Sequence, residues 1–373
     1  MIDNNIQRGV GIAARTIVFG LIASVMIACG DLNSESEMEA TTDVAPSNPL
    51  IARSGRVEVL DNGAVRFGFP GVSFKFEFTG SSLQLLASSE QGNSYLDIVV
   101  DGESSVINIP QNPTKIALLS GSAIGKHSVE IFNRSETWHG ITTLSSIEVG
   151  QGTLLAKPAL PERKILVIGD SITCGEAIES PAECGTKAND WWNPRLSYGM
   201  LMAAEFDAQA HLVCMGGHGL IRNWDGVTTD INAPVYYDLA IVAGDASVSW
   251  SQADYTPDLV YIALGTNDFS THAGPIPSES DYVEPYIGFV KKILSDHPNT
   301  QVVLTEGPML DGEAKAALSK YLGITKARVG SDQVHVVHAK KYPSGPCDFH
   351  PGKAEHAGIA ADIIPPIKTI MGW

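Results

Sequence analysis

The sequence predicts an N-terminal all-β sandwich of jelly-roll type and a C-terminal α/β domain built on a mainly parallel sheet. Residues 51–156 contain short alternating or apolar runs separated by turn signals, a pattern typical of an antiparallel sandwich. Two prolines at residues 157–161 mark a linker. Beyond it, apolar strand-like runs alternate with helical patterns, which implies a parallel sheet flanked by helices. The chain of 373 residues is long enough for both domains.

Residues 1–29 are predicted to be a signal peptide with a lipobox-like end. Arg8 and Arg15 precede an apolar run at residues 17–28, which has the length of a signal-peptide core and is short for a membrane span. Small Ala28 precedes Cys29, so Cys29 is the predicted site of lipidation. Ordinary cleavage near Ala28 and an uncleaved anchor are the alternatives. The pattern predicts an exported bacterial protein, anchored in the membrane as a lipoprotein and facing the periplasm or the cell surface.

Residues 30–50 are predicted to form a disordered tether. The segment is rich in Ser, Glu, Thr, Asp and Pro, and it contains too little apolar surface to order itself. It would connect the anchor to the folded part of the chain.

Residues 51–157 are predicted to form the β-sandwich. The predicted strands are the runs at residues 56–60, 64–69, 73–78, 82–86, 95–100, 126–132 and 141–144. Turn signals separate them, such as Asp-Asn-Gly at residues 61–63. Phe74, Phe76 and Phe78 share one face of a strand by the two-residue period, so they are predicted to lie in the core.

Residues 158–373 are predicted to form the α/β domain. Its predicted elements are strands at residues 165–168, 259–264 and 301–305 and amphipathic helices at residues 197–206 and 283–296. Polar clusters follow two of these strands, with Ser171 after the first and Asn267 after the second. In open α/β sheets, ligands and chemistry are found at the carboxyl ends of the strands.

Ser171 and His350 are the candidate nucleophile and base. A serine hydroxyl is a poor nucleophile until a base takes its proton. The ordinary pKa of histidine, about 6.5, suits proton transfer at neutral pH. Ser171 stands in Gly-Asp-Ser-Ile-Thr-Cys-Gly at residues 169–175, and His350 in Cys-Asp-Phe-His-Pro at residues 347–351. A turn directly after a strand also presents a backbone N–H beside the hydroxyl.

These motifs, in the order Ser, Asn, His, resemble the SGNH (GDSL-type) hydrolase superfamily over residues 160–373. The Gly-Gly-His-Gly segment at residues 216–219 and Gly-Thr-Asn-Asp-Phe at residues 265–269 make the chain most similar to carbohydrate esterase family 2, of the acetyl xylan esterase type. That family couples an N-terminal β-sandwich to a C-terminal three-layer SGNH domain and removes acetyl groups from plant polysaccharides. The resemblance therefore implies a secreted O-acetyl esterase that acts on xylan or mannan through an acetyl-serine intermediate.

The resemblance also assigns an oxyanion hole, the set of donors that stabilises the tetrahedral intermediate. Its members would be the backbone N–H of Ser171, the backbone N–H of Gly217 and the side-chain amide of Asn267. Gly219 is a competing assignment because the spacing of the glycines is ambiguous.

Asp348 is the candidate partner that orients His350. It lies two residues before the histidine, and Cys347 occupies the position three residues before, where the acid of the superfamily is commonly found. Some members of carbohydrate esterase family 2 hold the histidine through a backbone carbonyl. Asp348 is therefore expected to act through either its carboxylate or its carbonyl, and the sequence leaves both open. Asp170 and Asp268 are interpreted as structural carboxylates that accept hydrogen bonds from turn N–H groups.

Several tryptophans are candidates for a sugar-binding platform, since indole rings stack on pyranose faces and also serve as packing anchors. The residues in connecting segments are Trp138, Trp191, Trp192, Trp224 and Trp250. Trp224 is favoured because it follows the glycine-rich segment.

Four cysteines beyond Cys29 could pair in an exported protein. Cys174–Cys184 is suggested by proximity in sequence. The alternative is that Cys174, three residues after Ser171, and Cys347, three residues before His350, lie near each other in space. Free buried thiols are a further alternative. Neither a metal nor a cofactor is expected, because no CxxC pair occurs and His335 and His338 point to opposite faces of a strand.

The net charge of −17 argues against a nucleic-acid partner, whose phosphates would repel the chain. The expected partner is an acetylated polysaccharide or oligosaccharide, with membrane contact only through the lipid anchor. Two alternative functions remain. A GDSL-type lipase or thioesterase would need an extended apolar acyl groove, and a non-enzymatic glycan-binding protein would use the sandwich as its binding module.

Overall fold

The computed structural model describes residues 40–228 and 231–373. The predictions for the signal peptide, the lipobox, Cys29 and residues 30–39 of the tether lie outside the described residues. The described residues form one compact unit. Within the described ranges, no helix combines the length and the apolar character needed to cross a bilayer.

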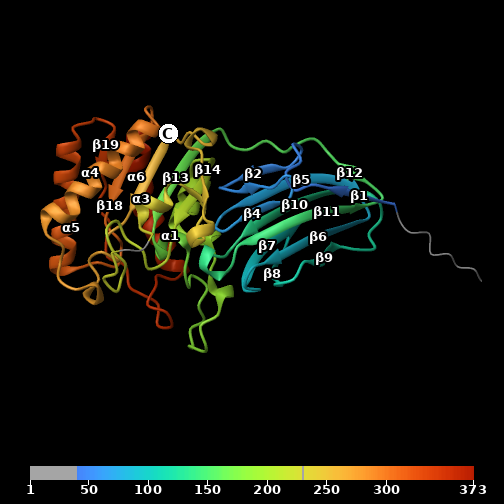
Figure 1. Ribbon diagram of the computed structural model, residues 1–373, viewed down its shortest axis with the longest axis horizontal. Helices are drawn as coiled ribbons and strands as arrows, with labels where there is room; N and C mark the ends of the chain where they lie inside the picture. Colours follow the sequence, from blue (N-terminus) through green and yellow to red (C-terminus); the bar gives the residue numbers. More distant parts are fainter. Residues whose placement is uncertain (1–39, 229–230) are drawn as a thin grey trace, which may run out of the picture. The chain divides into compact units, whose positions relative to one another are not determined.

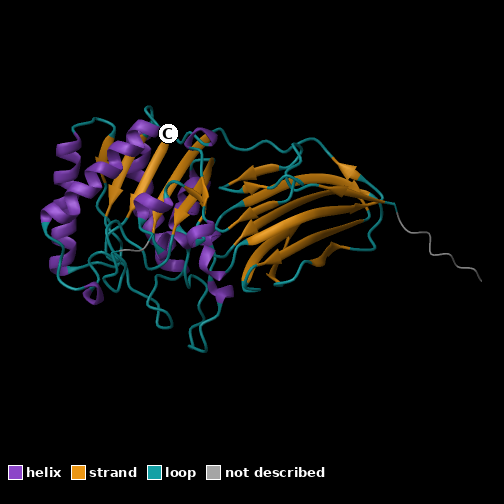
Figure 2. Ribbon diagram, viewed as in Figure 1, coloured by secondary structure: helices purple, strands orange, loops and turns teal. Residues whose placement is uncertain are grey.

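Residues 41–154 form two antiparallel six-stranded sheets, which we call the β region (Figures 1 and 2). The first sheet contains, in spatial order, β3 (Glu58–Val59), β4 (Val65–Phe67), β11 (Thr142–Gly150), β6 (Ser82–Ser89) and β9 (Thr114–Leu119), with β1 (Thr41–Val44) also paired to β11. The second contains β12 (Thr153–Leu154), β5 (Ser73–Gly80), β10 (Gly125–Asn133), β7 (Ser94–Val100) and β8 (Glu103–Ile109), with β2 (Ala52–Ser54) also paired to β5.

The two sheets share one hydrophobic core. Phe74, Phe76 and Phe78 from β5 are buried there with Leu85 from β6 and Ile147 from β11. The alternation along β5 buries every second residue, as predicted from the period of two. The antiparallel β-sheet fold expected for this part is therefore confirmed, and the jelly-roll connectivity stays a prediction.

Strand β1 corrects the tether prediction for residues 41–44. Thr41–Val44 pairs antiparallel with β11, with Val44 opposite Ile147. The composition of this segment is polar, but backbone pairing to an existing sheet edge needs no apolar face of its own. The single buried side chain, Val44, anchors the strand to the core.

Residues 163–371 form the α/β region around a five-stranded parallel sheet (Figure 1). Its spatial order is β14 (Ala208–Cys214), β13 (Arg163–Gly169), β17 (Leu259–Ala263), β18 (Gln301–Thr305) and β19 (Val334–Val336). A two-stranded antiparallel ribbon of β15 (Leu239–Ile241) and β16 (Val248–Ser249) is separate from it.

Helices cover both faces of this sheet. On one face α2 (Tyr198–Glu205) and α6 (Lys353–Met371) pack in a core with Ile165 and Val167 of β13. On the other face, the core that contains Leu166 and Ile168 also contains residues of α4 (Glu279–Asp296) and α5 (Gly312–Val329). Successive residues of β13 thus serve opposite layers. This confirms the parallel α/β fold and the predicted helices at residues 197–206 and 283–296.

The β region contacts the α/β region through buried polar groups. Arg56 is 2% exposed, and its Nη1 donates to the backbone oxygens of Tyr237 (2.6 Å) and Leu239 (2.8 Å). Burial lowers the pKa of Arg56 to about 9, although nearby Tyr237 and Asp238 oppose this. A charged hydrogen-bond donor placed between the two regions fixes their relative position, because leaving it unpaired would be costly.

The cysteines form two disulfides, Cys174–Cys214 and Cys184–Cys347. The expected Cys174–Cys184 pair is wrong, and Cys174 does not pair with Cys347 either. Cys214 lies opposite Gly169 in the β13–β14 register, and the turn after Gly169 brings Cys174 over it. Neighbouring strands, and not nearness in sequence, decide this pairing.

Candidate active site

Ser171 lies at the carboxyl end of β13, as the first residue of the short helix α1 (Ser171–Cys174). Asp170 caps this helix, since its carboxylate accepts from the backbone N–H of Ile172 at 3.1 Å. Gly169 is required before it, because a Cβ there would lie 1.9 Å from Thr173 Oγ1. The strand, the cap and the turn hold Ser171 at 6% exposure. Asp170 has the structural role expected of it.

His350 lies within hydrogen-bonding distance of Ser171. Its Nε2 is 2.8 Å from Ser171 Oγ, and its Nδ1 is 2.8 Å from the backbone oxygen of Asp348. A carbonyl oxygen only accepts, so Nδ1 carries a proton, and in the neutral imidazole Nε2 is left as the acceptor for the serine hydroxyl. The structure thus brings together two residues 179 positions apart in the arrangement of a nucleophile and its base.

The Asp348 carboxylate does not hold the imidazole by a hydrogen bond. Its Oδ2 lies 3.6 Å from His350 Nδ1, whereas its Oδ1 lies 2.9 Å from Lys187 Nζ. Burial alone would raise the pKa of Asp348, but His350 and Lys187 outweigh it and lower that pKa. Of the two alternatives for Asp348, the geometry favours the backbone carbonyl.

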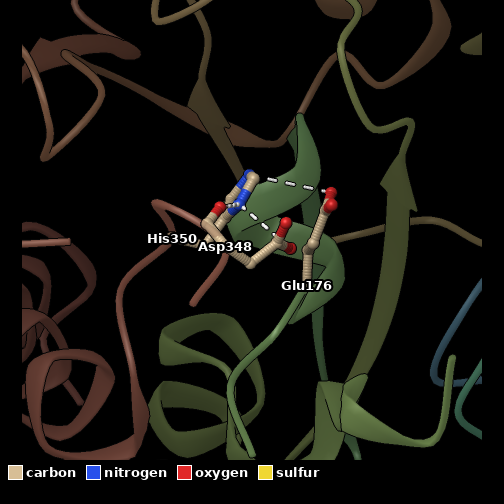
Figure 3. Close-up of side chains that lie close together, drawn as sticks. All are labelled: Glu176, Asp348 and His350. Carbon is tan, nitrogen blue, oxygen red and sulfur yellow. Dashed lines mark hydrogen bonds and ion pairs between the residues drawn. The ribbon is translucent and has the colours of Figure 1, made fainter. Parts of the chain in front are cut away.

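Glu176 and Lys187 complete the surroundings of His350, and sequence reasoning missed both. Lys187 Nζ bridges Glu176 Oε1 (2.6 Å) and Asp348 Oδ1 (2.9 Å). Glu176 Oε2 lies 3.6 Å from His350 Nε2, and Figure 3 shows both carboxylates pointing toward the ring. Glu176 belongs to the same turn as Ser171, which was the one available signal. Lys187 lies in an irregular segment where no pattern marks it.

The charge around His350 favours its protonated form. Burial opposes the imidazolium, but Asp348 and Glu176 outweigh burial and raise the pKa of His350 to about 9. Glu176, Asp348 and His350 lie close enough to resemble a metal site. The Lys187 ammonium already bridges the two carboxylates, however, and both ring nitrogens of His350 are engaged. The set is therefore arranged around a lysine cation.

The two remaining oxyanion candidates line the same pocket as Ser171. Asn267 is 8% exposed, and its Nδ2 donates to the backbone oxygen of His218 at 2.9 Å, which orients the amide. Nδ2 carries two hydrogens, so this bond uses only one of them. Gly217 has φ 76°, a backbone conformation that favours glycine.

Gly219 does not line this pocket. A Cβ on Gly219 would lie 2.4 Å from Asp268 Oδ2, so this glycine makes room for the Asp268 carboxylate. Asp268 in turn accepts from the backbone N–H groups of Leu220 (2.9 Å) and Ile221 (2.8 Å). Asp268 has the structural role expected of it, and the geometry favours Gly217 over Gly219 as the donor.

The pocket has a volume of about 530 Å³ and is lined in part by aromatic side chains. Trp224 and Trp138 line it and are 50% and 43% exposed. Trp192 is fully buried, and neither Trp191 nor Trp250 is among the lining residues. Trp138 comes from the β region, so both regions contribute to the pocket.

Two family models match the chain. Residues 53–158 match "Carbohydrate esterase 2 N-terminal", and residues 167–357 match "GDSL-like Lipase/Acylhydrolase family". An acetylxylan esterase / glucomannan deacetylase of Cellvibrio japonicus (strain Ueda107) is 41% identical over 342 residues, which cover 91% of this chain and 94% of that protein. The chain belongs to carbohydrate esterase family 2. As a family 2 esterase it is a carboxylic ester hydrolase, and the family resemblance stated from the motifs is confirmed.

Solved structures of family 2 esterases are similar over the same range. A family two carbohydrate esterase from Cellvibrio japonicus is 41% identical, with a TM-score of 0.87 over 90% of this chain and 99% of that one. A family two carbohydrate esterase from Clostridium thermocellum in complex with cellohexaose is 26% identical, with a TM-score of 0.78 over 87% of this chain and 99% of that one. A second Cellvibrio japonicus protein with the same name as the first is 31% identical over 371 residues, 95% of this chain and 98% of that protein.

Proposed function

We propose that this chain removes O-linked acetyl groups from plant cell-wall polysaccharides such as xylan and mannan. The observation that carries the proposal is the contact of Ser171 Oγ with His350 Nε2 at 2.8 Å inside a pocket that Asn267 and Gly217 also line. The relative named acetylxylan esterase / glucomannan deacetylase supports the substrate class.

The proposed reaction passes through an acetyl-Ser171 intermediate. His350 Nε2 takes the hydroxyl proton while Ser171 Oγ attacks the acetyl carbonyl carbon. The oxyanion that forms is stabilised by the N–H groups of Ser171 and Gly217 and by the Asn267 amide. His350 then returns its proton to the departing sugar oxygen as the ester bond breaks. In the second half, His350 takes a proton from water, whose oxygen attacks the acetyl carbon. The bond from that carbon to Ser171 Oγ then breaks, His350 gives the proton to Oγ, and acetate is released.

The backbone carbonyl of Asp348 keeps His350 in the tautomer that this cycle needs. The exposed rings of Trp138 and Trp224 offer apolar faces to a pyranose next to the serine. We therefore include Trp224 as a sugar-contacting residue.

Acetate release from a panel of acetylated glycans tests the proposal. Wild type should release acetate from acetylated xylan or glucomannan, and Ser171→Ala should not. Equal release by the two proteins would contradict the proposal.

A comparison of acetyl and octanoyl nitrophenyl esters separates this function from a GDSL-type lipase or thioesterase. An acetylesterase should strongly prefer the acetyl ester, because a pocket shaped for a two-carbon acyl group excludes a long chain. A preference for octanoate would favour the lipase alternative. Retention on xylan, mannan or cellulose without acetate release would favour the glycan-binding alternative.

We also propose that the chain is exported and lipidated at Cys29. The support is the sequence pattern of residues 8–29 alone. Growth with labelled palmitate should label wild type and leave Cys29→Ser unlabelled. An unlabelled wild-type protein whose N-terminus is not Cys29 would contradict this.

A further inference from the structure

Glu136 is a carboxylate of the β region that is buried at the edge of the active-site pocket. It follows β10 and is 1% exposed. Its Oε2 accepts from the backbone N–H of Gly216 at 2.6 Å, and its Oε1 accepts from Trp192 Nε1 at 2.9 Å. Gly216 directly precedes Gly217, the candidate oxyanion donor. Glu136 therefore holds the peptide next to the one that the reaction would use.

Gly216 leaves room for this contact. A Cβ at that position would lie 3.0 Å from Glu136 Oε2 and 3.2 Å from Glu176 Oε2. Both carboxylates thus crowd the same side of Gly216, where any other residue would displace them. Gly216 is not among the left-handed glycines of the described chain, so the reason for a glycine here is space and not backbone conformation.

Two buried carboxylates this close repel each other. Burial raises the pKa of Glu136, and the charge of Glu176 raises it further, whereas donors from Trp192, Gly216 and Trp138 act in the opposite direction. Lys187 pairs with Glu176 at 2.6 Å and offsets part of the repulsion. On its other side, Glu136 N donates to His139 Nδ1, and burial lowers the pKa of His139 to about 3, so this ring is neutral. The Glu136 carboxylate is thus buried beside a second carboxylate, which is an unfavourable environment for a negative charge. Such a residue is unexpected if its only role is to join the β region to the α/β region.

We propose that Glu136 is a positioning residue for acyl transfer, which holds the Gly216–Gly217 turn so that the Gly217 N–H faces the reacting carbonyl. This inference rests on the proposed esterase function. It makes the β region part of the catalytic machinery, because that region supplies the acceptor that fixes one wall of the oxyanion hole.

Glu136→Gln tests the inference with little change of shape. The amide keeps one acceptor oxygen, but its NH₂ group then faces one of the two donors. The turnover number kcat on an acetyl ester should fall about 10- to 100-fold while KM changes less than about 2-fold, because misalignment of a donor affects the transition state more than substrate binding. Glu136→Asp keeps the charge but shortens the reach, and it should fall between Glu136→Gln and wild type. If Glu136→Gln does not fold, Glu136→Asp carries the same test.

Arg56→Met is the matched control. It also removes a buried hydrogen-bonding contact between the β region and the α/β region, and Arg56 does not line the active-site pocket. Arg56→Met should lower the melting temperature and leave kcat unchanged. If loss of contact between the regions is all that matters, both variants will lose kcat in proportion to their lost stability, and the inference is then wrong.

The pH profile adds a readout that a merely structural role would not change. Ionised Glu136 accepts both donors, whereas protonated Glu136 must use one oxygen as a donor. The charged or titratable groups around it are Glu176, Lys187, His139 and, beyond Glu176, His350. In wild type, activity requires a neutral His350 and an ionised Glu136. A plot of log kcat/KM against pH should therefore have a slope of about one where only His350 becomes protonated, and a slope of about two at low pH, where Glu136 becomes protonated as well. Glu136→Gln should keep a slope of about one throughout.

The outcomes separate the two proposals. A Glu136→Gln protein with wild-type kcat and a slope of two would overturn the positioning role and leave the esterase function intact. Equal acetate release by wild type and Ser171→Ala would instead remove the function on which the inference rests.

Discussion

Ser171 lies at the end of a buried strand, whereas His350 lies in a segment of turns and bends before α6. The serine is held by regular structure: the β13 backbone, the Asp170 cap and Gly169. The histidine is held by contacts from distant parts of the chain: the Asp348 carbonyl, the Lys187 bridge and the Cys184–Cys347 disulfide. Each segment carries a disulfide, but Cys174–Cys214 joins the serine turn to the neighbouring strand β14, whereas Cys184–Cys347 joins two irregular segments. The nucleophile is therefore placed by the sheet and the turn that follows β13, while its base depends on contacts between irregular segments.

The largest effect on kcat should come from a residue that, like Ser171, comes shortly after a strand of the parallel sheet. Asn267 follows β17, and its amide is oriented by the His218 carbonyl. Asn267→Ala should lower kcat by about 10²- to 10³-fold, a loss of about 2.7–4 kcal/mol in transition-state stabilisation, since other single oxyanion donors contribute this much. Steady-state kinetics on an acetyl ester measures it, with exposed Asn112→Ala as the control. A variant with full turnover would remove Asn267 from the site.

The pH dependence should be the next largest effect, and it tests the histidine side. The imidazolium cannot accept the serine proton, and the pKa of His350 is raised to about 9 by Asp348 and Glu176 against the effect of burial. Activity should therefore be lost as pH falls through about 9, with kcat/KM about 100-fold lower at pH 7 than on the plateau. Glu176→Gln removes one of the stabilising charges, so the profile should shift to lower pH.

The control for this shift is Glu279→Gln, which removes an exposed carboxylate paired with Lys320. It should leave the profile where it is in wild type. A wild-type profile centred at the ordinary histidine pKa, unchanged in Glu176→Gln, would show that the two carboxylates do not act on the ring.

An intermediate effect is expected from the disulfide that holds the His350 segment. Cys184 is exposed, whereas Cys174 and Cys214 are buried, so mild reductant should open Cys184–Cys347 first. The double variant Cys184→Ser/Cys347→Ser should lose about 10-fold in kcat because His350 is less well positioned. Its circular dichroism spectrum should stay native. Unchanged turnover would mean that the Asp348 carbonyl and Lys187 suffice to hold the segment.

The smallest effect should come from Asp348→Ala, because alanine keeps the backbone carbonyl that accepts from His350 Nδ1. We expect a loss of less than about 10-fold in kcat/KM, well below the roughly 10⁴-fold that a triad carboxylate contributes. Asp348→Asn should behave in the same way. A loss of the full triad magnitude would show that the carboxylate moves onto the ring during the reaction.

The sequence predicted the central strands because their side chains are apolar on both faces. The predicted runs at residues 165–168, 259–264 and 301–305 fall on β13, β17 and β18. The sequence did not reveal β14, because the polar residues Gln209 and His211 interrupt its apolar run. It also did not reveal α6, because that helix contains Pro365 and Pro366. Local patterns fail where tertiary packing accommodates a residue that the pattern forbids.

The sequence by itself determined the residue types of the site and the order in which they occur, because a serine after a strand and a histidine in a short motif are local features. Only the tertiary structure decided how these residues are connected. The carbonyl of Asp348, and not its carboxylate, holds His350, and Cys174 pairs with Cys214. Three further charged residues surround the site, namely Glu136, Glu176 and Lys187. Apart from the contact between Asp348 and His350, which are two residues apart, these contacts join residues between 11 and 80 positions apart in the chain. No local pattern encodes which polar groups meet when such segments fold together.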